Sequence, residues 1–308
     1  MEFKHEPIML NECLENLNIK KDGIYVDGTL GGAGHSIKIL ERLGENGRHI
    51  GIDRDEDALA ASRKRLEKYS NMTYVWGNHE NIRSHLDELK IDFVDGILLD
   101  LGVSSYQIDE GERGFSYTKN ARLDMRMNRK QDLDAEYIIN NYTKEELEKI
   151  FFEYGEENFS KKITSKIIKQ REQKRIETTY ELTDIIRSAV PKNSIDSFKR
   201  IFQALRIEVN GELKDLKKAV EDSILSLNNG GRLCIITFHS LEDRIVKNTF
   251  IEYEGRCTCP KDFPKCVCNY KSYGKIITKK PIIPSKEEQE KNPRSKSAKL
   301  RVFERHID

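Results

Sequence analysis

The stretch YVDGTLGGAGHS, residues 25–36, places four glycines among the seven positions from Gly28 to Gly34, between a short apolar run and an expected helix. A glycine-rich turn between a strand and a helix lets a ligand approach the backbone, because glycine lacks a Cβ and accepts positive φ angles. An ordinary turn of this kind would explain one or two glycines. Four of them, close to strand-end carboxylates, indicate a nucleoside cofactor site.

Around this turn, short β-rich runs alternate with helical segments through the first hundred residues. The pattern predicts strands at 23–27, 48–53, 72–76 and 94–101, and helices at 35–43, 56–69 and 81–89. The fourth run has a continuous apolar core, which suits a strand buried on both faces. The alternation therefore predicts an α/β fold with a doubly wound, parallel, Rossmann-like sheet.

The alternation stops near residue 105. From there to residue 204, charged segments carry apolar residues at helical spacing, which predicts an inserted helical domain within a sheet domain of residues 1–104 and 205–308. A long helix is then expected to end at residues 228–231, before a strand at 230–238. The runs 274–280 and 298–305 are candidates for the last strands, and the proline- and charge-rich run between them is expected to be an exposed loop.

Composition excludes several classes of protein. The chain has 308 residues, a net charge of +1, 37% hydrophobic and 34% charged residues, which is typical of a soluble protein and not of a strongly basic nucleic-acid binder. It has no apolar stretch of about 20 residues that could span a membrane. The N-terminal residues do not resemble an export signal, so a cytoplasmic location is expected.

Four cysteines cluster in CTCPKDFPKCVC. Cys257, Cys259, Cys266 and Cys268 form two closely spaced pairs, which favours a structural zinc site over two disulfides in a reducing compartment, with unliganded thiols as an alternative. Cys13 and Cys234 stand alone in apolar surroundings and are expected to be buried.

The cofactor class follows from the glycine spacing and from Asp53. Asp53 ends the second expected strand, where a carboxylate can accept hydrogen bonds from both hydroxyls of an adenosine ribose. The loop lacks the G-x-G-x-x-G register of dinucleotide sites and the Gly-Lys-Ser/Thr of ATP-binding loops, which disfavours both ligands. S-adenosylmethionine remains, with its carboxylate near the helix start and its sulfonium near Asp27 and Asp100.

Two further segments follow strands. In LLDLGVSSYQIDEGERGF, residues 98–115, Asp100, Ser104 and Ser105 could orient an amine and accept its proton, although the serines also suit a simple turn. In FHSLEDR, residues 238–244, His239 is a candidate for substrate contact or proton handling, with a core or helix-capping role as the alternative.

Several segments together resemble one family: DGTLGGAGHS, GIDRD, DGILLDLGVSS, ERGFS, LDMRM, YGEE, FQALRIEVNGEL, GGRLCIITFHSLEDR and NPRSKSAKLR. They are similar to the bacterial 16S rRNA cytosine-N4 methyltransferases, the RsmH or MraW family, from His5 to Arg301. The resemblance implies a class I methyltransferase sheet interrupted by a helical domain. It also implies methyl transfer from S-adenosylmethionine to N4 of a cytidine in the decoding region of the small ribosomal subunit.

Matching the family motifs residue by residue implies cofactor contacts at Ala33, Gly34, His35, Asp53, His79, Asp100 and Gln107. His79 stands where relatives often have an aromatic residue, and Tyr106 stands where many have proline. The paired cysteines belong to only part of the family, so zinc is not implied for catalysis.

The implied partner is 16S rRNA, and a homodimer is left open. Phosphates would be held by the basic segment 159–175, including Lys161, Lys162 and Lys166, for which a solvated helix face is the alternative. Candidates for stacking on or clamping an unstacked cytosine are Phe115, Tyr117, Arg122 and Arg126. The rival functions are a noncatalytic RNA-binding assembly factor and an NAD-dependent oxidoreductase.

Overall fold

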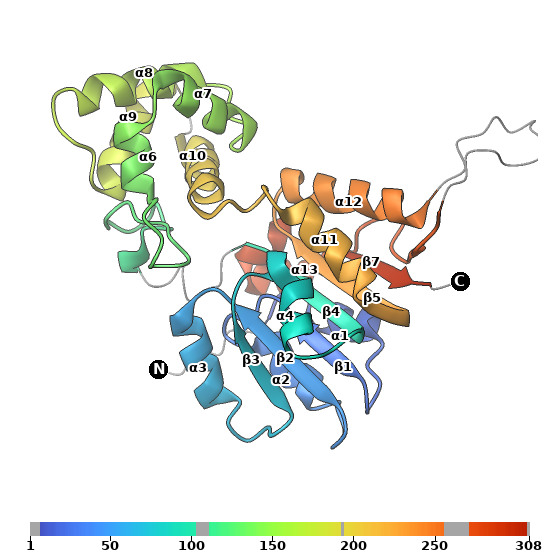
Figure 1. Ribbon diagram of the computed structural model, residues 1–308. Helices are drawn as coiled ribbons and strands as arrows, with labels where there is room; N and C mark the ends of the chain where they lie inside the picture. The colour runs from blue at the N-terminus through green and yellow to red at the C-terminus, as the bar shows by residue number, and fades with distance from the viewer. Residues whose placement is uncertain (1–6, 103–110, 192–193, 256–270, 307–308) are drawn as a thin grey trace, which may run out of the picture. The chain divides into compact units, whose positions relative to one another are not determined.

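The computed structural model describes residues 7–102, 111–191, 194–255 and 271–306. The chain forms two compact units, a sheet unit of residues 1–102 with 215–308 and a helical unit of residues 103–214 (Figure 1). The sequence placed the insert at 105–204, and the helical unit ends ten residues later (214 against 204). Its last helix, α10 (Ser194–Asn210), runs past residue 204 and is followed by Gly211 with a φ of 63°.

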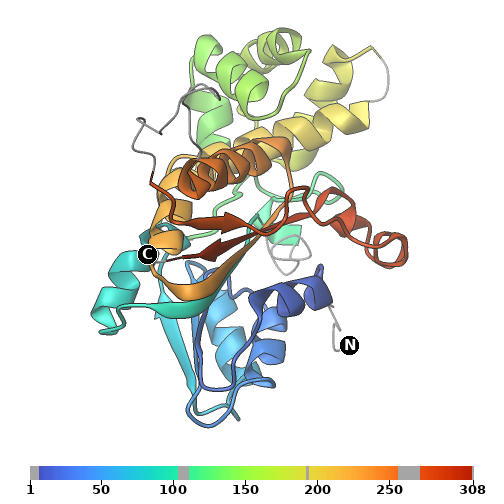
Figure 2. The same ribbon diagram turned by 90° about the vertical axis from the view of Figure 1, so that its right-hand side faces the viewer.

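The sheet unit is built on a seven-stranded sheet whose order is β3-β2-β1-β4-β5-β7-β6. The strands are β1 (Ile24–Asp27), β2 (Arg48–Asp53), β3 (Met72–Trp76), β4 (Val94–Asp100), β5 (Leu227–Thr237), β6 (Gly274–Ile276) and β7 (Lys299–Arg305). Strands β1 to β5 are parallel, whereas β7 runs antiparallel to β5 and β6 (Figure 2). The expected Rossmann-like fold is confirmed, but the sheet is mixed and not wholly parallel, because antiparallel strands are added at one edge.

Helices cover both faces of this sheet. On one face lie α1 (Leu10–Leu17), α2 (Gly34–Leu40) and α3 (Glu56–Arg65), and on the other lie α4 (Ile82–Glu88), α11 (Leu216–Leu225) and α12 (Ser240–Glu254) (Figure 1). Buried side chains from α1 and α2 pack against Tyr25, Leu98 and Ile236 of the sheet. The layers hold β1 and β4 in place, and with them the loops that leave their carboxyl ends.

Two expectations about the C-terminal half were wrong. The helix before β5 ends at Leu225 rather than at residues 228–231, because those residues belong to β5, whose pairing with β4 is irregular between Val94 and Gly96. The proline-rich run between β6 and β7 is not only a loop. It contains α13 (Lys286–Lys291), whose N-cap Ser285 accepts a hydrogen bond from the Glu288 amide.

The helical unit consists of η2 (Gly111–Arg113), α6 (Ala135–Asn141), α7 (Lys144–Glu153), α8 (Ser160–Arg171), α9 (Thr179–Ala189) and α10. The starts of α7 and α9 follow from their sequences, since Thr143 with Glu146 and Thr178 with Glu181 form capping boxes. Within residues 111–191 and 194–214, no segment joins a sheet, and one isolated bridge joins Arg122 and Thr178. The helices enclose a core of their own.

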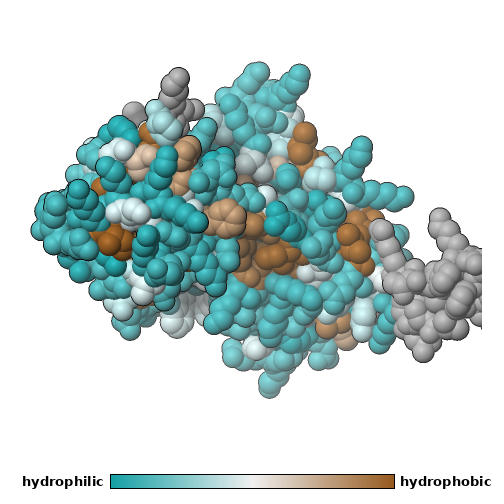
Figure 3. Space-filling model, turned by 90° about the horizontal axis from the view of Figure 1, so that it is seen from above, coloured by the Kyte–Doolittle hydropathy of each residue, from teal (hydrophilic) through white to brown (hydrophobic). Residues whose placement is uncertain are grey.

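The outer surface agrees with the composition. Hydrophilic residues predominate on the face shown in Figure 3. None of the helices in the described ranges is long and apolar enough to cross a membrane.

Candidate functional site

Three carboxylates lie at the carboxyl ends of neighbouring parallel strands. Asp27 ends β1, Asp53 ends β2 and Asp100 ends β4, and β1 pairs with both of the other strands. The strand order reverses between β1 and β4, and ligands of doubly wound sheets bind at such a switch point. The residues that the sequence singled out at strand ends therefore meet at one edge of the sheet.

Asp27 is buried and braces the glycine loop from inside. Its Oδ2 accepts a hydrogen bond from Ser36 Oγ over 2.7 Å, and its Oδ1 accepts one from the Thr29 amide over 3.1 Å. Ser36 Oγ is also 2.8 Å from His49 Nε2. Since Ser36 gives its only hydrogen to Asp27, His49 is the donor in this second contact. Asp27 is thus a buried acceptor that fixes the start of α2.

Two glycines of the loop are required by close packing. A Cβ on Gly28 would lie 2.4 Å from Leu99 Cδ2 and 3.1 Å from His79 Cβ, and a Cβ on Gly34 would lie 2.5 Å from Pro7 Cγ. Leu99 is fully buried and cannot move aside freely. The loop is therefore pressed against both β4 and the N-terminal segment.

Asp53 holds the loop from the second strand. Its Oδ2 accepts a hydrogen bond from the Gly31 amide over 2.7 Å, and its Oδ1 accepts one from the Asp55 amide over 2.9 Å. Burial raises the pKa of Asp53 to about 6, although both backbone hydrogen bonds lower it. The carboxylate is therefore largely ionised at neutral pH.

Asp100 and His35 face each other. The distance from His35 Nδ1 to Asp100 Oδ2 is 3.8 Å, and the two side chains are 7% and 28% exposed. Burial, followed by the charges of Asp27 and Glu242, raises the pKa of Asp100 to about 8, and burial lowers the pKa of His35. The Asp100 amide donates a hydrogen bond to Thr29 Oγ1 over 2.6 Å, which ties the end of β4 to the glycine loop.

His79 begins a short 3₁₀ helix, η1 (His79–Asn81), after β3. Burial, aided by the charge of Arg54, lowers the pKa of His79 to about 3. The ring is therefore neutral at physiological pH, and the Cβ of His79 lies close to Gly28 of the glycine loop.

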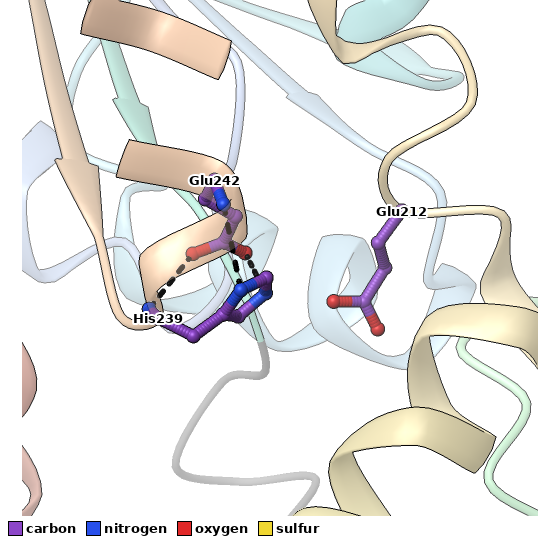
Figure 4. Close-up of side chains that lie close together, drawn as sticks. All are labelled: Glu212, His239 and Glu242. Atoms are coloured by element: carbon purple, nitrogen blue, oxygen red, sulfur yellow. Dashed lines mark hydrogen bonds and ion pairs between the residues drawn. The ribbon is translucent and has the colours of Figure 1, made fainter. Parts of the chain in front are cut away.

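His239 caps the N-terminus of α12, which agrees with the helix-capping role expected as the alternative to substrate contact or proton handling. Its Nδ1 accepts a hydrogen bond from the Glu242 amide over 3.4 Å (Figure 4). Glu242 Oε2 accepts one from the Phe238 amide over 2.8 Å. His239 Nε2 lies 3.1 Å from Glu242 Oε1. Glu212, also drawn in Figure 4, belongs to the helical unit, where it accepts two hydrogen bonds from Arg206.

Comparison with known proteins now identifies the family. A family model described as the MraW methylase family matches residues 2–306. The chain belongs to the MraW methylase family. Two proteins from Clostridium botulinum, strains 657 and Kyoto, both named ribosomal RNA small subunit methyltransferase H, are 59% and 58% identical over 305 residues, covering 98% of this chain and 99% of theirs. A solved rRNA methylase from Streptococcus thermophilus is 12% identical over the whole of both chains, with a TM-score of 0.42.

Several residues that the sequence analysis singled out lie outside the described ranges. They are Ser104, Ser105, Tyr106 and Gln107 after β4, and the four clustered cysteines, Cys257, Cys259, Cys266 and Cys268. Cys13 and Cys234 are free and buried, as expected.

Four MraW residues proposed to hold an unstacked base have structural partners within the helical unit. Arg126 forms a bidentate pair with Asp124, and Arg122 contacts Asp134 and Glu136. Phe115 and Tyr117 pack against the core of the unit. These contacts give all four side chains a role in folding, which the sequence alone did not reveal.

The basic helix α8 is different. Arg171 donates to the Ile139 carbonyl. Lys161, Lys162, Lys166 and Lys169 are all exposed, and no ion pair is found for them within the described residues. Burial falls on the opposite side of the helix, at Ile163, Thr164 and Ile167. The helix therefore presents a row of exposed positive charges, one of which, Lys162 Nζ, lies 5.6 Å from the centroid of the Phe159 ring.

Sequence reasoning missed the residues that support the site in this MraW chain. Thr29, Ser36 and His49 connect the glycine loop to Asp27 and to Asp100. Thr29 and Ser36 lie inside the quoted stretch, so hydroxyl groups following a strand-end aspartate were the available signal. His49 carried no such signal, because a histidine in a buried strand is ordinarily a packing residue.

Proposed function

We propose that this protein transfers a methyl group from S-adenosylmethionine to N4 of a cytidine in the decoding region of 16S rRNA, in the small ribosomal subunit and in the cytoplasm. The observation that carries the proposal is the grouping of Asp53 and Asp100 around the glycine loop in a chain of the MraW methylase family. The names of the curated relatives, small subunit methyltransferases, support the substrate class.

In this proposal the cofactor lies along the carboxyl ends of β1, β2 and β4. Asp53 accepts hydrogen bonds from the ribose, and its ionised state at neutral pH suits that task. Ala33, Gly34 and His35 line the methionine portion, and the neutral ring of His79 lies against adenine in place of an aromatic residue. Gln107 supplies a further contact.

Methyl transfer requires a nitrogen lone pair to attack the methyl carbon in line with the bond to sulfur. The carbon–nitrogen bond forms as the carbon–sulfur bond breaks, its electron pair passes to sulfur to give the neutral thioether, and the amine then loses a proton to solvent. We assign Asp100, with Ser104 and Ser105 after it, to orienting the amine. His239 acts indirectly by holding the start of α12.

The helical unit is proposed to recognise RNA. A cytosine must leave its stack before its amine can reach the methyl group, so the surrounding strand has to be held through its phosphates. The exposed Lys161, Lys162 and Lys166 on α8 suit this role. Phe152 on the neighbouring α7 is 63% exposed and is available to stack on a base.

The decisive experiment uses small ribosomal subunits from a strain that lacks this protein. Incubation with a labelled methyl donor should place label on one cytidine, which mass spectrometry identifies as N4-methylated. Label on another base or position would refute the assigned substrate. Binding of subunits without methyl transfer would favour the noncatalytic assembly factor instead.

Zinc on the four clustered cysteines and a homodimer also remain proposals from the sequence. Metal analysis of the purified protein should give one zinc per chain, and a variant with all four cysteines changed to serine should give none. Sedimentation equilibrium measures the oligomeric state.

A further inference from the structure

The surroundings of Asp100 disfavour its negative charge. The carboxylates of Asp27 on β1 and Glu242 on α12 both act on it, and so does the buried Cys13 thiol of α1 if it ionises. Asp100 Oδ1 is enclosed and has no hydrogen-bond partner among the described residues. An ionised carboxylate in this place would be poorly compensated.

Among the described residues, His35 of α2 also faces Asp100, and its tautomer is set by the backbone. Its Nε2 lies 3.0 Å from the carbonyl oxygen of Ile8, which can only accept, so Nε2 carries a hydrogen. In the neutral ring, Nδ1 therefore presents a lone pair toward Asp100 Oδ2, 3.8 Å away. A lone pair and a carboxylate repel each other unless one of them carries a proton.

The burial of both groups decides where that proton is. Burial disfavours a charged imidazole more than the nearby charge of Asp27 favours it, so the pKa of His35 is lowered. Burial also disfavours a charged Asp100, and the charges of Asp27 and Glu242 add to that effect. One proton on Asp100, with a neutral His35, leaves both groups uncharged. This arrangement is the state in which no uncompensated charge is buried.

We propose that the pair of His35 and Asp100 holds one proton in the ligand-free protein and releases it when S-adenosylmethionine binds, so that the ionised Asp100 balances the sulfonium charge. The inference rests on the proposed function, since it needs this cofactor at this site. The O–H bond of Asp100 breaks, the proton goes to solvent, and no bond of the cofactor changes. His35 is then a positioning residue that acts through Asp100.

This coupling would distinguish the methyl donor from its product. S-adenosylhomocysteine has the same adenosine and amino-acid portions but a neutral thioether. Its binding brings no sulfonium charge that would stabilise an ionised Asp100. Raising the pH should therefore strengthen the binding of the donor relative to the product. After methyl transfer the pair would take up a proton again, and the next donor molecule would displace that proton on binding.

Isothermal titration calorimetry tests the coupling directly. Titrations at pH 7 in two buffers with different ionisation enthalpies give the number of protons released per ligand. We expect about one proton more for S-adenosylmethionine than for S-adenosylhomocysteine, and a ratio of their affinities that changes up to about tenfold per pH unit below pH 8. The contact with Asp53 and the ligand amino group are common to both ligands, so the difference between them isolates the sulfonium.

Two substitutions of equal shape on β4 provide the comparison. Asp100→Asn cannot lose a proton, so the two ligands should release equal numbers. Asp95→Asn lies at the other end of the strand, where Asp95 contacts Lys20 and the Ile24 amide, and should leave the difference intact. If Asp100→Asn does not fold, the pH dependence of the affinity ratio of the two ligands, measured with the unchanged protein, still tests the inference.

The outcomes separate this inference from the proposed function. Tight binding of both ligands by the unchanged protein with equal proton release would overturn the inference and leave the function standing. Failure to bind either ligand would overturn the function itself.

Discussion

Ser36 Oγ lies 2.7 Å from Asp27 Oδ2 and 2.8 Å from His49 Nε2, so one hydroxyl joins α2, β1 and β2 beneath the glycine loop. All three side chains are buried. A buried polar chain of this kind stabilises a fold when every member has a partner and destabilises it when one partner is removed.

Ser36→Ala should therefore lower the free energy of unfolding by about 1–3 kcal/mol, because Asp27 loses a donor and His49 loses an acceptor. Ser223→Ala is the matched control. Ser223 is equally buried, but its hydroxyl donates to the Ala219 carbonyl within α11, so its loss should cost less. Urea denaturation measures both variants, and equal losses would show that the chain of hydrogen bonds adds nothing.

Gly28→Ala should reduce both stability and cofactor affinity, since the new Cβ would meet Leu99 and His79. Overpacking of this kind costs about 1–3 kcal/mol. Gly32→Ala provides the comparison, because its Cβ would have Arg65 Nη1, 3.8 Å away, as its nearest neighbour. Thermal unfolding with and without S-adenosylmethionine should show a loss for the first variant and little change for the second.

Cofactor affinity should fall as the pH drops below about 6, because Asp53 then gains a proton and loses an acceptor for the ribose. Asp53→Asn should weaken binding about tenfold at pH 7.5, equivalent to roughly one charge-assisted hydrogen bond, and should remove this part of the pH dependence. S-adenosylhomocysteine is the better ligand for this titration, because it lacks the sulfonium charge. An unchanged acid limb in the variant would show that another group titrates.

Asp100→Asn should stabilise the ligand-free protein at pH 8. The pKa of Asp100 in the folded protein, about 8, lies above its ordinary value of 3.8, so its contribution to stability is present below pH 4 and is lost as the pH rises toward 8. Asparagine has no proton to lose, and the expected gain at pH 8 is about 1–3 kcal/mol after allowance for partial exposure. Denaturation of both proteins at pH 5 and pH 8 checks the prediction, which requires the difference to grow with pH.

Changing Lys161, Lys162 and Lys166 together to glutamate should weaken binding to small-subunit rRNA at least about tenfold and flatten its salt dependence, because phosphate contacts are lost. Cofactor affinity should be unaffected. A control with the same change of charge replaces Lys279, Lys280 and Lys286, which are exposed in the sheet unit. If both triple variants lose RNA affinity equally, net charge and not α8 is responsible.

The strand and helix pattern from β1 to β4 was predictable because each element there has a local signal, whereas α1 was not predicted. Alternating β-rich runs, turn residues and helical spacing locate β1 to β4 within one or two residues of their observed bounds. The start of β5 at Leu227 was not predictable, since Asn228 to Gly231 read locally as a turn and only pairing with β4 makes them a strand. Local sequence signals do not predict secondary structure where pairing with a neighbouring strand determines it.

The residues of the candidate site likewise divide into those that the sequence predicted and those that it did not. Asp53, Asp100 and the glycines could be proposed from the sequence because they follow predicted parallel strands, whose carboxyl ends lie at one edge of the sheet. The partners of Arg122 and Arg126 were not found, because an arginine in a charged segment reads the same whether it binds phosphate or a carboxylate. Likewise, the hydrogen bonds of Asn210 with the backbone of Met125 and Met127 join two family motifs and were not predicted. These residues are separated from Asn210 by 85 and 83 positions in the sequence.

The place of β7 between β5 and β6 has a consequence for how the chain is made. During translation, residues 103–214 leave the ribosome as one continuous piece that already contains its own core, whereas β5 must wait for residues 299–305 before its second edge is paired. Until then an open strand edge can join another nascent chain. Newly synthesised sheet units should therefore be most prone to aggregate, and most in need of a chaperone, just before the final strand emerges.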